Sequence, residues 1–229
     1  IKNNFDFVAL LHGDGQYAPE YLEKLVEPLN RDDIDAVFGS RMIIKGGALK
    51  GKMPLYKFIA NKVITFFQNF LLKTHYSEFH SGYRVYKVGS LKRIPFHLNS
   101  NSYPFDTEII IQFINSKFKI IEIAIPTFYG SEISYVNGTK YAFQICFTTI
   151  KAKLQKLGIF YDRKFDCEPE GASAYLPKEN FASTHSEIIN LVKNNSRILD
   201  LGCNDGGVGF LLKEKKNCSV VGVDKKKNS

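Results

Sequence analysis

The hydrophobic and polar positions of the chain alternate in blocks that predict strands and helices in turn. A continuous apolar run over residues 7–11 predicts a strand that is buried on both faces and ends in a glycine-flanked turn. Residues 18–29 predict a helix, because leucines recur at helical spacing behind a proline that suits a first turn. Residues 36–40 predict a second strand, and residues 44–52 a loop rich in glycine and lysine.

Residues 55–72 are a long amphipathic segment, and we predict a helix there. Phenylalanine, isoleucine and valine crowd one side of it, whereas lysine, glutamine and asparagine occupy the other. A core helix of a basic domain is the simpler interpretation. A helix that rests on a membrane surface is the alternative, and the sequence leaves both open.

The rest of the chain continues the alternation and then restarts it. Strands are predicted at 83–86 and 118–124, helices at 105–116 and 139–157, and a loop at 126–138. Proline, glycine and weak periodicity mark a linker over residues 158–180. Beyond it, helices are predicted at 181–193 and 206–216, and strands at 197–201 and 219–223.

This pattern predicts an α/β protein with two domains. Residues 1–157 are expected to form a partial domain on a Rossmann-like mixed sheet, and residues 181–229 a truncated domain with the first βαβ unit of a doubly wound fold. A buried strand close to residue 1 and an unfinished sheet at residue 229 lead us to expect a fragment that is inactive by itself.

Charge and cysteine usage narrow the partners. The net charge is +8, and its excess lies in residues 1–160, which carry 20 basic and 13 acidic side chains. Nucleotide phosphates or anionic lipid suit such a surface. No nucleic-acid recognition motif is present, so we expect no nucleic acid partner. Four scattered cysteines indicate reduced thiols and a cytoplasmic location, and no apolar stretch is long enough to span a bilayer.

The turn after the first strand carries the first candidate chemistry. In open α/β sheets ligands bind beyond the carboxyl ends of the strands, where His12, Asp14 and Gln16 stand. Asp14 and Gln16 are hard oxygen donors, suited to Mg²⁺ or Mn²⁺ beside a phosphate. Transfer of a sugar from a nucleotide needs charge neutralisation of the leaving diphosphate, a positioned acceptor, and a base if that acceptor is a hydroxyl.

Four segments in order carry a family resemblance: LLHGDGQYAPEYL, VFGSRM, EFHSGYRVY and FDTEIIIQF. Together they resemble glycosyltransferase family 2, especially its dolichol- and polyprenol-phosphate sugar transferases, over roughly residues 5–157. The resemblance implies a GT-A fold and an inverting, metal-assisted transfer from a nucleotide-sugar donor to a glycan or lipid-linked acceptor. It also implies a metal-binding Asp-x-Asp at a strand end.

Carried over by position, the resemblance implies roles for individual residues. His12 stands at the first acid of the Asp-x-Asp and Asp14 at the second. The tyrosine and glycine at 129–130 stand where the lipid-phosphate enzymes carry an arginine. The expected metal ligands are Asp14 and Gln16; the expected donor-binding residues are His12, Asp14, Gln16, Arg41, Arg84 and Lys140; the expected catalytic carboxylates are Glu78 and Asp106.

A second motif lies near the end of the chain. LDLGCNDGG followed by VVGVD resembles class I S-adenosylmethionine-dependent methyltransferases, over about residues 181–229. Its glycines allow close approach of the backbone to a ligand, and an acid after the next strand suits ribose hydroxyls. The resemblance implies S-adenosylmethionine binding by Asp200, Gly202, Cys203, Asn204, Gly206 and Asp224.

The sequence therefore predicts a glycosyltransferase joined to a methyltransferase, acting in glycan biosynthesis. It is expected in the cytoplasm or at the cytoplasmic face of the membrane, with peripheral membrane contact. Three alternatives stay open. The protein is a polyprenyl-phosphate sugar transferase at the membrane surface, a methyltransferase with a non-catalytic glycosyltransferase-like domain, or a binding module.

Overall fold

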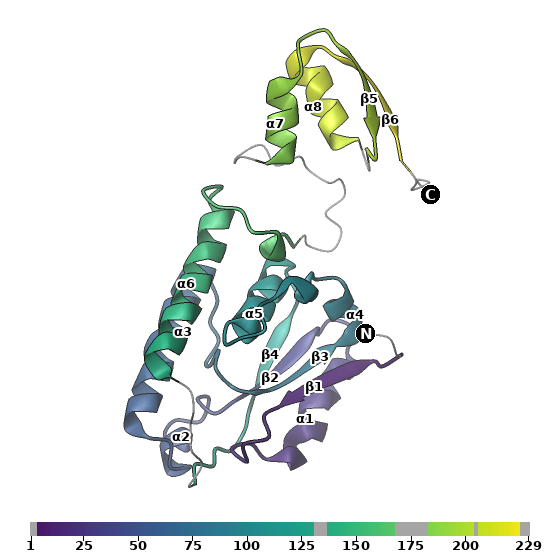
Figure 1. The fold of residues 1–229 in the computed structure, drawn as a ribbon. Coiled ribbons are helices and arrows are strands. Elements are labelled where there is room, and N and C mark those ends of the chain that lie inside the picture. The colour runs from purple at the N-terminus through teal and green to yellow at the C-terminus, as the bar shows by residue number, and fades with distance from the viewer. Residues whose placement is uncertain (1–3, 131–136, 168–182, 204–205, 225–229) are drawn as a thin grey trace. The chain divides into compact units, whose positions relative to one another are not determined.

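The computed structural model describes residues 4–130, 137–167, 183–203 and 206–224. The chain divides into two compact units (Figure 1). The first comprises residues 1–155 and 162–169, and the second comprises residues 156–161 and 170–229. Each unit is an α/β structure with its own sheet, as the sequence predicts.

The first unit is built on a mixed sheet with the strand order β1-β3-β2-β4. The strands are β1 (Phe7–Leu11), β2 (Ala36–Ser40), β3 (Tyr83–Lys87) and β4 (Ile120–Ala124). β3 runs antiparallel to both β1 and β2, and β4 runs parallel to β2. The carboxyl ends of β1, β2 and β4 therefore meet at one edge of the sheet, together with the first residue of β3.

The helices of the first unit follow the predicted order with a few differences. Residues 19–30 form one helical stretch whose two ends are 3₁₀ turns, and a short helix interrupts the expected 44–52 loop. The elements are η1 (Pro19–Tyr21), α1 (Leu22–Val26), η2 (Glu27–Asn30), α2 (Gly47–Lys50), α3 (Leu55–Leu72), α4 (Val88–Lys92), η3 (Phe96–Leu98), α5 (Phe105–Asn115), α6 (Gly138–Lys156) and η4 (Arg163–Phe165).

Alternate residues of the central strands face two separate cores, as the two-residue repeat of a strand requires. Phe38 belongs to the cluster that contains α5 residues such as Phe113. Its neighbour Val37 belongs to the cluster that contains Leu25 and Leu29 of the first helical stretch. The sheet is thus covered on both faces, which explains why β2 is buried throughout.

The expectation that β1 is buried on both faces is wrong for this structure. Among the described residues β1 pairs only with β3 and forms an edge of the sheet, so Val8 and Leu11 are 43% and 39% exposed. An apolar run shows that a strand is suited to burial, but burial itself depends on neighbours contributed by other parts of the chain.

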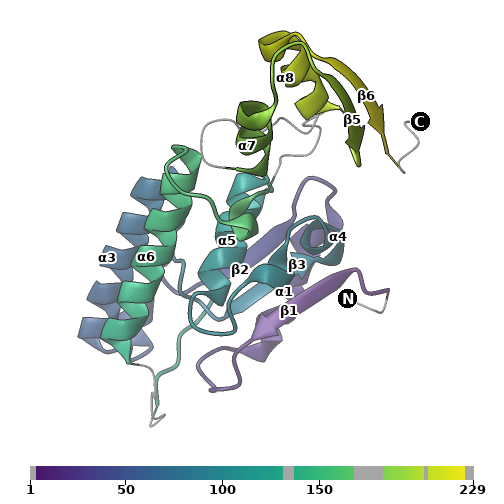
Figure 2. The ribbon, with the colours of Figure 1, turned by 45° about the horizontal axis from the view of Figure 1, so that its top comes forward.

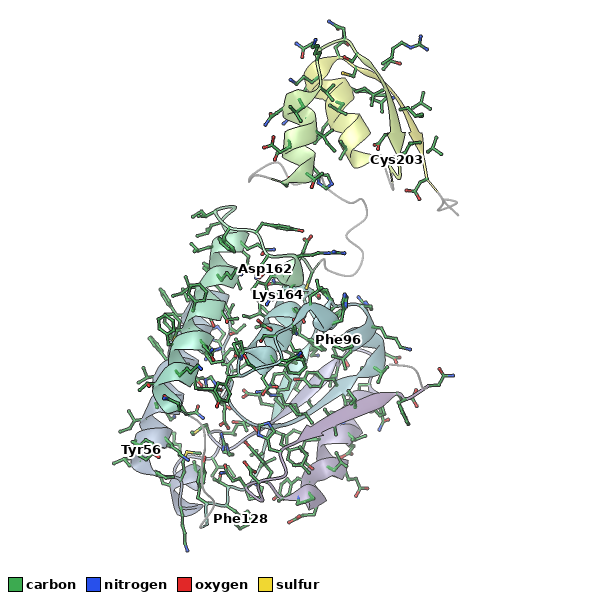
Figure 3. The ribbon with its side chains drawn as sticks, viewed as in Figure 1. Tyr56, Phe96, Phe128, Asp162, Lys164 and Cys203 are labelled. Atoms are coloured by element: carbon green, nitrogen blue, oxygen red, sulfur yellow. The ribbon has the colours of Figure 1, made fainter. Side chains whose placement is uncertain are left out.

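The expected linker also contains a folded segment. Phe165 is buried, and the Lys164 ammonium lies 2.9 Å from Glu108 of α5 (Figure 3). The Gln112 amide of α5 donates to the Lys164 carbonyl at 2.9 Å. Residues 162–167 therefore pack on the first unit rather than acting as a spacer.

Helix α3 has the predicted bounds, but it presents its polar side to the protein. Asn61, Thr65 and Gln68 are buried, whereas Phe66 and Phe70 are each 74% exposed. Tyr56, at the start of the helix, projects outward from the first unit (Figure 3). The core-helix interpretation is therefore wrong for the apolar side of α3. None of the described helices is both long and apolar enough to cross a membrane.

The second unit contains two parallel strands and two helices in the order predicted. They are α7 (Thr184–Leu191), β5 (Arg197–Leu201), α8 (Gly207–Lys216) and β6 (Ser219–Val223). Both strands have the predicted bounds. A small core of Ile189, Leu212 and Cys218 holds the helices against the strands.

Candidate functional site

The topology of the first unit brings four distant segments to one edge of its sheet. The turn at residues 12–17 follows β1, Arg41 follows β2, and residues 125–130 follow β4. The register pairs Leu11 with Tyr83 and Ser40 with Ala124, so these ends are level. Antiparallel β3 starts at the same edge and brings residues 78–82 there. Ligand sites of open α/β sheets lie at this end of the strands.

The turn after β1 is attached to the segment that enters β3. The His12 amide donates to the Gly82 carbonyl at 3.2 Å, and the Gly82 amide donates to the Tyr17 hydroxyl at 2.7 Å. A Cβ on Gly82 would lie 2.2 Å from His12 Nδ1, so only glycine leaves room for this ring. Asp14 is exposed, and its Oδ1 accepts a hydrogen bond from the Gln16 amide at 3.1 Å.

Arg41 and Glu78 form a buried ion pair at the centre of the edge. Their side chains are 5% and 0% exposed. Glu78 accepts hydrogen bonds from the Arg41 amide at 2.8 Å, from Arg41 Nε at 3.0 Å and from Arg41 Nη2. The Asn61 amide of α3 donates to the same carboxylate at 2.8 Å. We call Arg41, Glu78 and Asn61 the arginine clamp.

Within the arginine clamp the Glu78 carboxylate and the Arg41 guanidinium both stay charged. Burial alone would raise the pKa of Glu78, but the Arg41 guanidinium and the hydrogen bonds of the clamp hold it below its usual value. Burial likewise opposes the charge of Arg41, and Glu78 more than offsets this, so the pKa of Arg41 is raised. A fully hydrogen-bonded carboxylate with a lowered pKa is a poor proton acceptor. Its oxygens are engaged by Arg41 and Asn61, so this geometry favours a positioning role for Glu78 over proton transfer, and the predicted role as a catalytic carboxylate stays a prediction.

Arg41 keeps one donor for a ligand. Its Nη1 donates to the Tyr129 hydroxyl at 3.2 Å, and Nη2 donates to the His80 carbonyl at 3.2 Å. With the bonds to Glu78, contacts to described residues use four of the five N–H donors of the guanidinium. The remaining Nη1 hydrogen suits an anionic group.

A pocket of about 680 Å³ opens beside the arginine clamp. Arg41, Lys50 and Lys52 line it together with residues 125–130. Its described lining contains no acidic side chain. The charged side chains of its described lining are thus all cationic, which suits phosphate groups at the carboxyl ends of the strands.

Arg84 and Asp106 lie beneath this edge and away from the pocket lining. Arg84 is 1% exposed, its Nη2 donates to the Phe79 carbonyl at 2.7 Å, and its Nη1 lies 3.3 Å from the Asp106 carboxylate. Asp106 remains partly accessible. The structure thus brings Arg84 to Asp106 rather than to an open phosphate site.

His80 is a neutral, shielded group in the same region. Its Nδ1 lies 2.8 Å from the Tyr141 hydroxyl, and its Nε2 is shielded from solvent without a hydrogen-bond partner among the described residues. Burial, with a smaller effect from Arg84 and Arg41, lowers the pKa of His80 to about 4. Burial also raises the pKa of the Tyr141 hydroxyl.

Of the remaining predicted donor-binding residues, Lys140 is exposed in the first turn of α6 and does not line the pocket. The sequence reasoning missed Asn61, Lys52, Tyr17 and Tyr129. Asn61 had a usable signal: Asn61, Thr65 and Gln68 recur at helical spacing, which marks a polar side of α3 able to serve buried partners.

The described residues contain no group of three or more histidine, cysteine, aspartate or glutamate side chains placed to hold a metal ion. The turn that carries His12, Asp14 and Gln16 still fits the expected Mg²⁺ or Mn²⁺. Mg²⁺ commonly takes one or two carboxylates and completes its shell with water and substrate phosphates. Asp14, exposed beside His12 and Gln16, is such a single carboxylate.

The glycine turn of the second unit lies beside the end of β6. Gly202 and Gly206 have φ angles of 80° and 78°, and the Gly202 amide donates to the Val223 carbonyl at 2.7 Å. Cys203 follows β5 (Figure 3) and packs so closely against Gly222 that a Cβ there would lie 2.7 Å from its sulfur. Asp224, after β6, is exposed, and Asp200 is partly buried within β5. Asn204 lies outside the described residues.

Comparisons with known proteins agree with the class that this fold and site indicate. Residues 4–95 match the family model described as glycosyl transferase family 2, and this match supports a glycosyltransferase. Residues 182–229 match the model described as methionine biosynthesis protein MetW.

Particular relatives match a little under two thirds of the chain. A UDP-N-acetylglucosamine–dolichyl-phosphate N-acetylglucosaminyltransferase of Methanococcus voltae is 31% identical over 155 residues, or 66% of this chain and 60% of the relative. An uncharacterized protein of Methanocaldococcus jannaschii is 34% identical over 143 residues, or 62% of this chain and 58% of the relative. The chain thus spans about 60% of the length of these relatives.

Proposed function

We propose that the first unit transfers a sugar from a nucleotide-sugar donor to a phosphate-bearing acceptor, with inversion at the sugar carbon. The observation that carries the proposal is the acid-free pocket lined by Arg41, Lys50 and Lys52, next to the Asp14 turn at the same edge of the sheet. Two phosphate-handling features at the carboxyl ends of parallel strands suit a donor diphosphate and an anionic acceptor.

In this reaction the bond between the sugar carbon and the leaving diphosphate breaks, and its electron pair goes to the diphosphate. An acceptor oxygen forms the new bond from the opposite face. Asp14, with His12 and Gln16, would hold Mg²⁺ or Mn²⁺, which when bound neutralises charge on the diphosphate. Arg41, oriented by Glu78 and Asn61, directs its free N–H at a phosphate oxygen.

We choose a phosphate acceptor because it does not need a base to remove a proton. A hydroxyl acceptor must lose a proton to a base, whereas a phosphate oxygen is already anionic. Glu78 is saturated with hydrogen bonds, and the described pocket lining has no carboxylate. The Methanococcus voltae relative is named for a dolichyl-phosphate acceptor. We therefore extend the proposal to a lipid-linked phosphate, reached at the cytoplasmic face of the membrane.

Three further residues take proposed roles around this centre. Arg84 orients the Asp106 carboxylate, which lies 3.3 Å away. Asp106, engaged by Arg84, is proposed to orient the acceptor rather than to accept a proton from it. Lys140 would reach donor phosphates from α6 when ligand is bound.

The test is a transfer assay on the full-length protein with a panel of nucleotide sugars, Mn²⁺ and polyprenyl phosphate. We expect Asp14→Ala to lower turnover by at least about tenfold, because the diphosphate loses its metal. The control Asp32→Ala removes an exposed acid from the same unit and leaves turnover unchanged. Equal turnover in Asp14→Ala and the parent protein would refute the metal role.

For the second unit we propose S-adenosylmethionine binding at the glycine turn. The left-handed Gly202 and Gly206 beside the end of β6 support it, because such a turn lets a ligand approach the backbone. Asp200, Cys203 and Asn204 would face the methionine part, and Asp224 the ribose. Calorimetry with S-adenosylmethionine should show binding that Asp224→Ala weakens. Methyl transfer without any sugar transfer would instead indicate that the first unit only recruits substrate.

A further inference from the structure

Helices α3 and α6 expose an unusually apolar surface. Six side chains define it, and we call them the α3–α6 face: Ile59, Val63, Phe66, Phe70, Phe143 and Phe147. Phe66 and Phe70 are 74% exposed, and Phe143 and Phe147 are 73% and 58% exposed. Large aromatic side chains gathered in this way on a surface mark an interaction site more often than chance exposure.

The two helices lie next to each other in the first unit. Figures 1 and 2 show α3 and α6 side by side from two directions, on the side of the sheet away from β1. The Gln68 amide of α3 lies 3.5 Å from the Thr149 hydroxyl of α6, which joins their inner sides. On the outer side the rings of Phe143 and Phe147 stack with centroids 6.3 Å apart.

The orientation of α3 is enforced from within. Asn61 donates to Glu78 of the arginine clamp, and Gln68 is fully buried against α6. Rotating the helix to hide its phenylalanines would expose these groups and leave the Glu78 carboxylate without one of its donors. The exposed apolar side is therefore a stable property of the folded unit.

Charge identifies the partner. The stretch from residue 36 to residue 77 contains no aspartate or glutamate but six lysines, Lys45, Lys50, Lys52, Lys57, Lys62 and Lys73. Helix α6 carries four lysines and no acid. Of these lysines, Lys57 and Lys62 lie on α3 itself. A helix that carries exposed aromatic side chains together with lysines suits the boundary between acyl chains and anionic headgroups. A second copy of the chain would meet this face with like charge, which opposes association.

We propose that the α3–α6 face docks on an anionic lipid bilayer, with its phenylalanines in the headgroup boundary and its lysines among the headgroups. This goes beyond the proposed sugar transfer and does not depend on it. Docking through α3 would also set the arginine clamp next to the bilayer, since Asn61 belongs to the same helix.

The test is co-sedimentation of the full-length protein with vesicles of phosphatidylcholine alone or with one quarter phosphatidylglycerol. We expect binding to the anionic vesicles that weakens with salt. Phe66→Ser combined with Phe70→Ser should lower the partition coefficient by about tenfold or more, because both rings leave the acyl boundary. Lys62→Gln should lower it by about fivefold on anionic vesicles and leave it unchanged on neutral ones. Phe5→Ser, which removes a 62%-exposed phenylalanine next to β1, is the matched control and should bind as the parent does.

Three results would overturn the proposal. The first is that the parent and Phe66→Ser/Phe70→Ser bind vesicles equally. The second is that the parent binds neutral and anionic vesicles equally. The third is that the parent binds no vesicles but forms a dimer, and that the double substitution abolishes this dimer. Circular dichroism melts check that the double variant stays folded, as its exposed positions predict. Titration of the same samples with a nucleotide sugar separates the two proposals. If the parent protein binds anionic vesicles but no nucleotide sugar, the sugar-transfer proposal is contradicted and the docking proposal stands.

Discussion

Replacing Glu78 by glutamine removes the charge that compensates buried Arg41 and keeps the size of the side chain. The carboxylate accepts hydrogen bonds from the Arg41 backbone and guanidinium and from Asn61, and both charged side chains are at most 5% exposed. In Glu78→Gln an amide group replaces one oxygen, so a donor faces a donor. Arg41 is left as a buried cation without its counter-charge.

Removing one partner of a buried ion pair costs about 3–5 kcal/mol. For a unit of this size that corresponds to a melting temperature about 10 °C lower. The loss depends on pH. Because the folded pKa of Glu78 is below its ordinary value, its stabilisation is complete above about pH 4.5 and fades as pH falls through the folded pKa. The parent and the variant should therefore converge in acid.

The assay is urea unfolding of the first unit, followed by circular dichroism at pH 7 and at pH 3. Asp33→Asn is the control, because the Arg31–Asp33 pair is exposed and should change stability little. A loss below about 1 kcal/mol at pH 7 would refute the view that Glu78 is the indispensable counter-charge of Arg41.

Two further predictions concern the same region. The His80 ring nitrogen is shielded from solvent and the pKa of the side chain is lowered to about 4. The unfolded chain therefore binds a proton that the folded unit does not bind, and stability should fall by up to about 3 kcal/mol from pH 6.5 to pH 4. In His80→Gln the free energy of urea unfolding should depend less on pH between pH 6.5 and pH 4, whereas His97→Gln, at an exposed site, should keep the parent's pH dependence. An unchanged pH dependence in His80→Gln would contradict the lowered pKa of His80. Gly82→Ala should displace the His12 ring, lower stability by about 1–3 kcal/mol and weaken donor binding in calorimetry, whereas Gly13→Ala, with open space at its Cβ, should be mild. Equal effects of the two alanine variants would count against the packing argument.

Local signals were sufficient wherever an element depends on its own residues. The bounds of β2, α3, β5 and β6 agree with the prediction residue for residue, because each is an uninterrupted apolar or amphipathic stretch closed by glycine, proline or a charged residue. The mixed α/β architecture follows from their alternation. Asp14 was also placed correctly beyond the end of a strand, since position relative to a strand is a sequence property.

The site differs from the prediction where a side chain depends on distant partners. Glu78 looks like an available carboxylate in the sequence, but Arg41 and Asn61 fold around it from 37 and 17 residues away. Arg84 carries the signature of a phosphate ligand, yet its place in the middle strand pair buries it against Asp106. The local sequence does not indicate which distant side chain will pair with Glu78 or Arg84 in the folded unit.

The amphipathic helix α3 separates the two levels most clearly. The sequence by itself determined that the helix exists, where it begins and ends, and that it has one apolar and one polar side, because these follow from a 3.6-residue repeat. Only the tertiary structure decided which side faces the protein. The Glu78 carboxylate and α6 require hydrogen-bond donors from α3, and supplying them through Asn61 and Gln68 turns the phenylalanines outward.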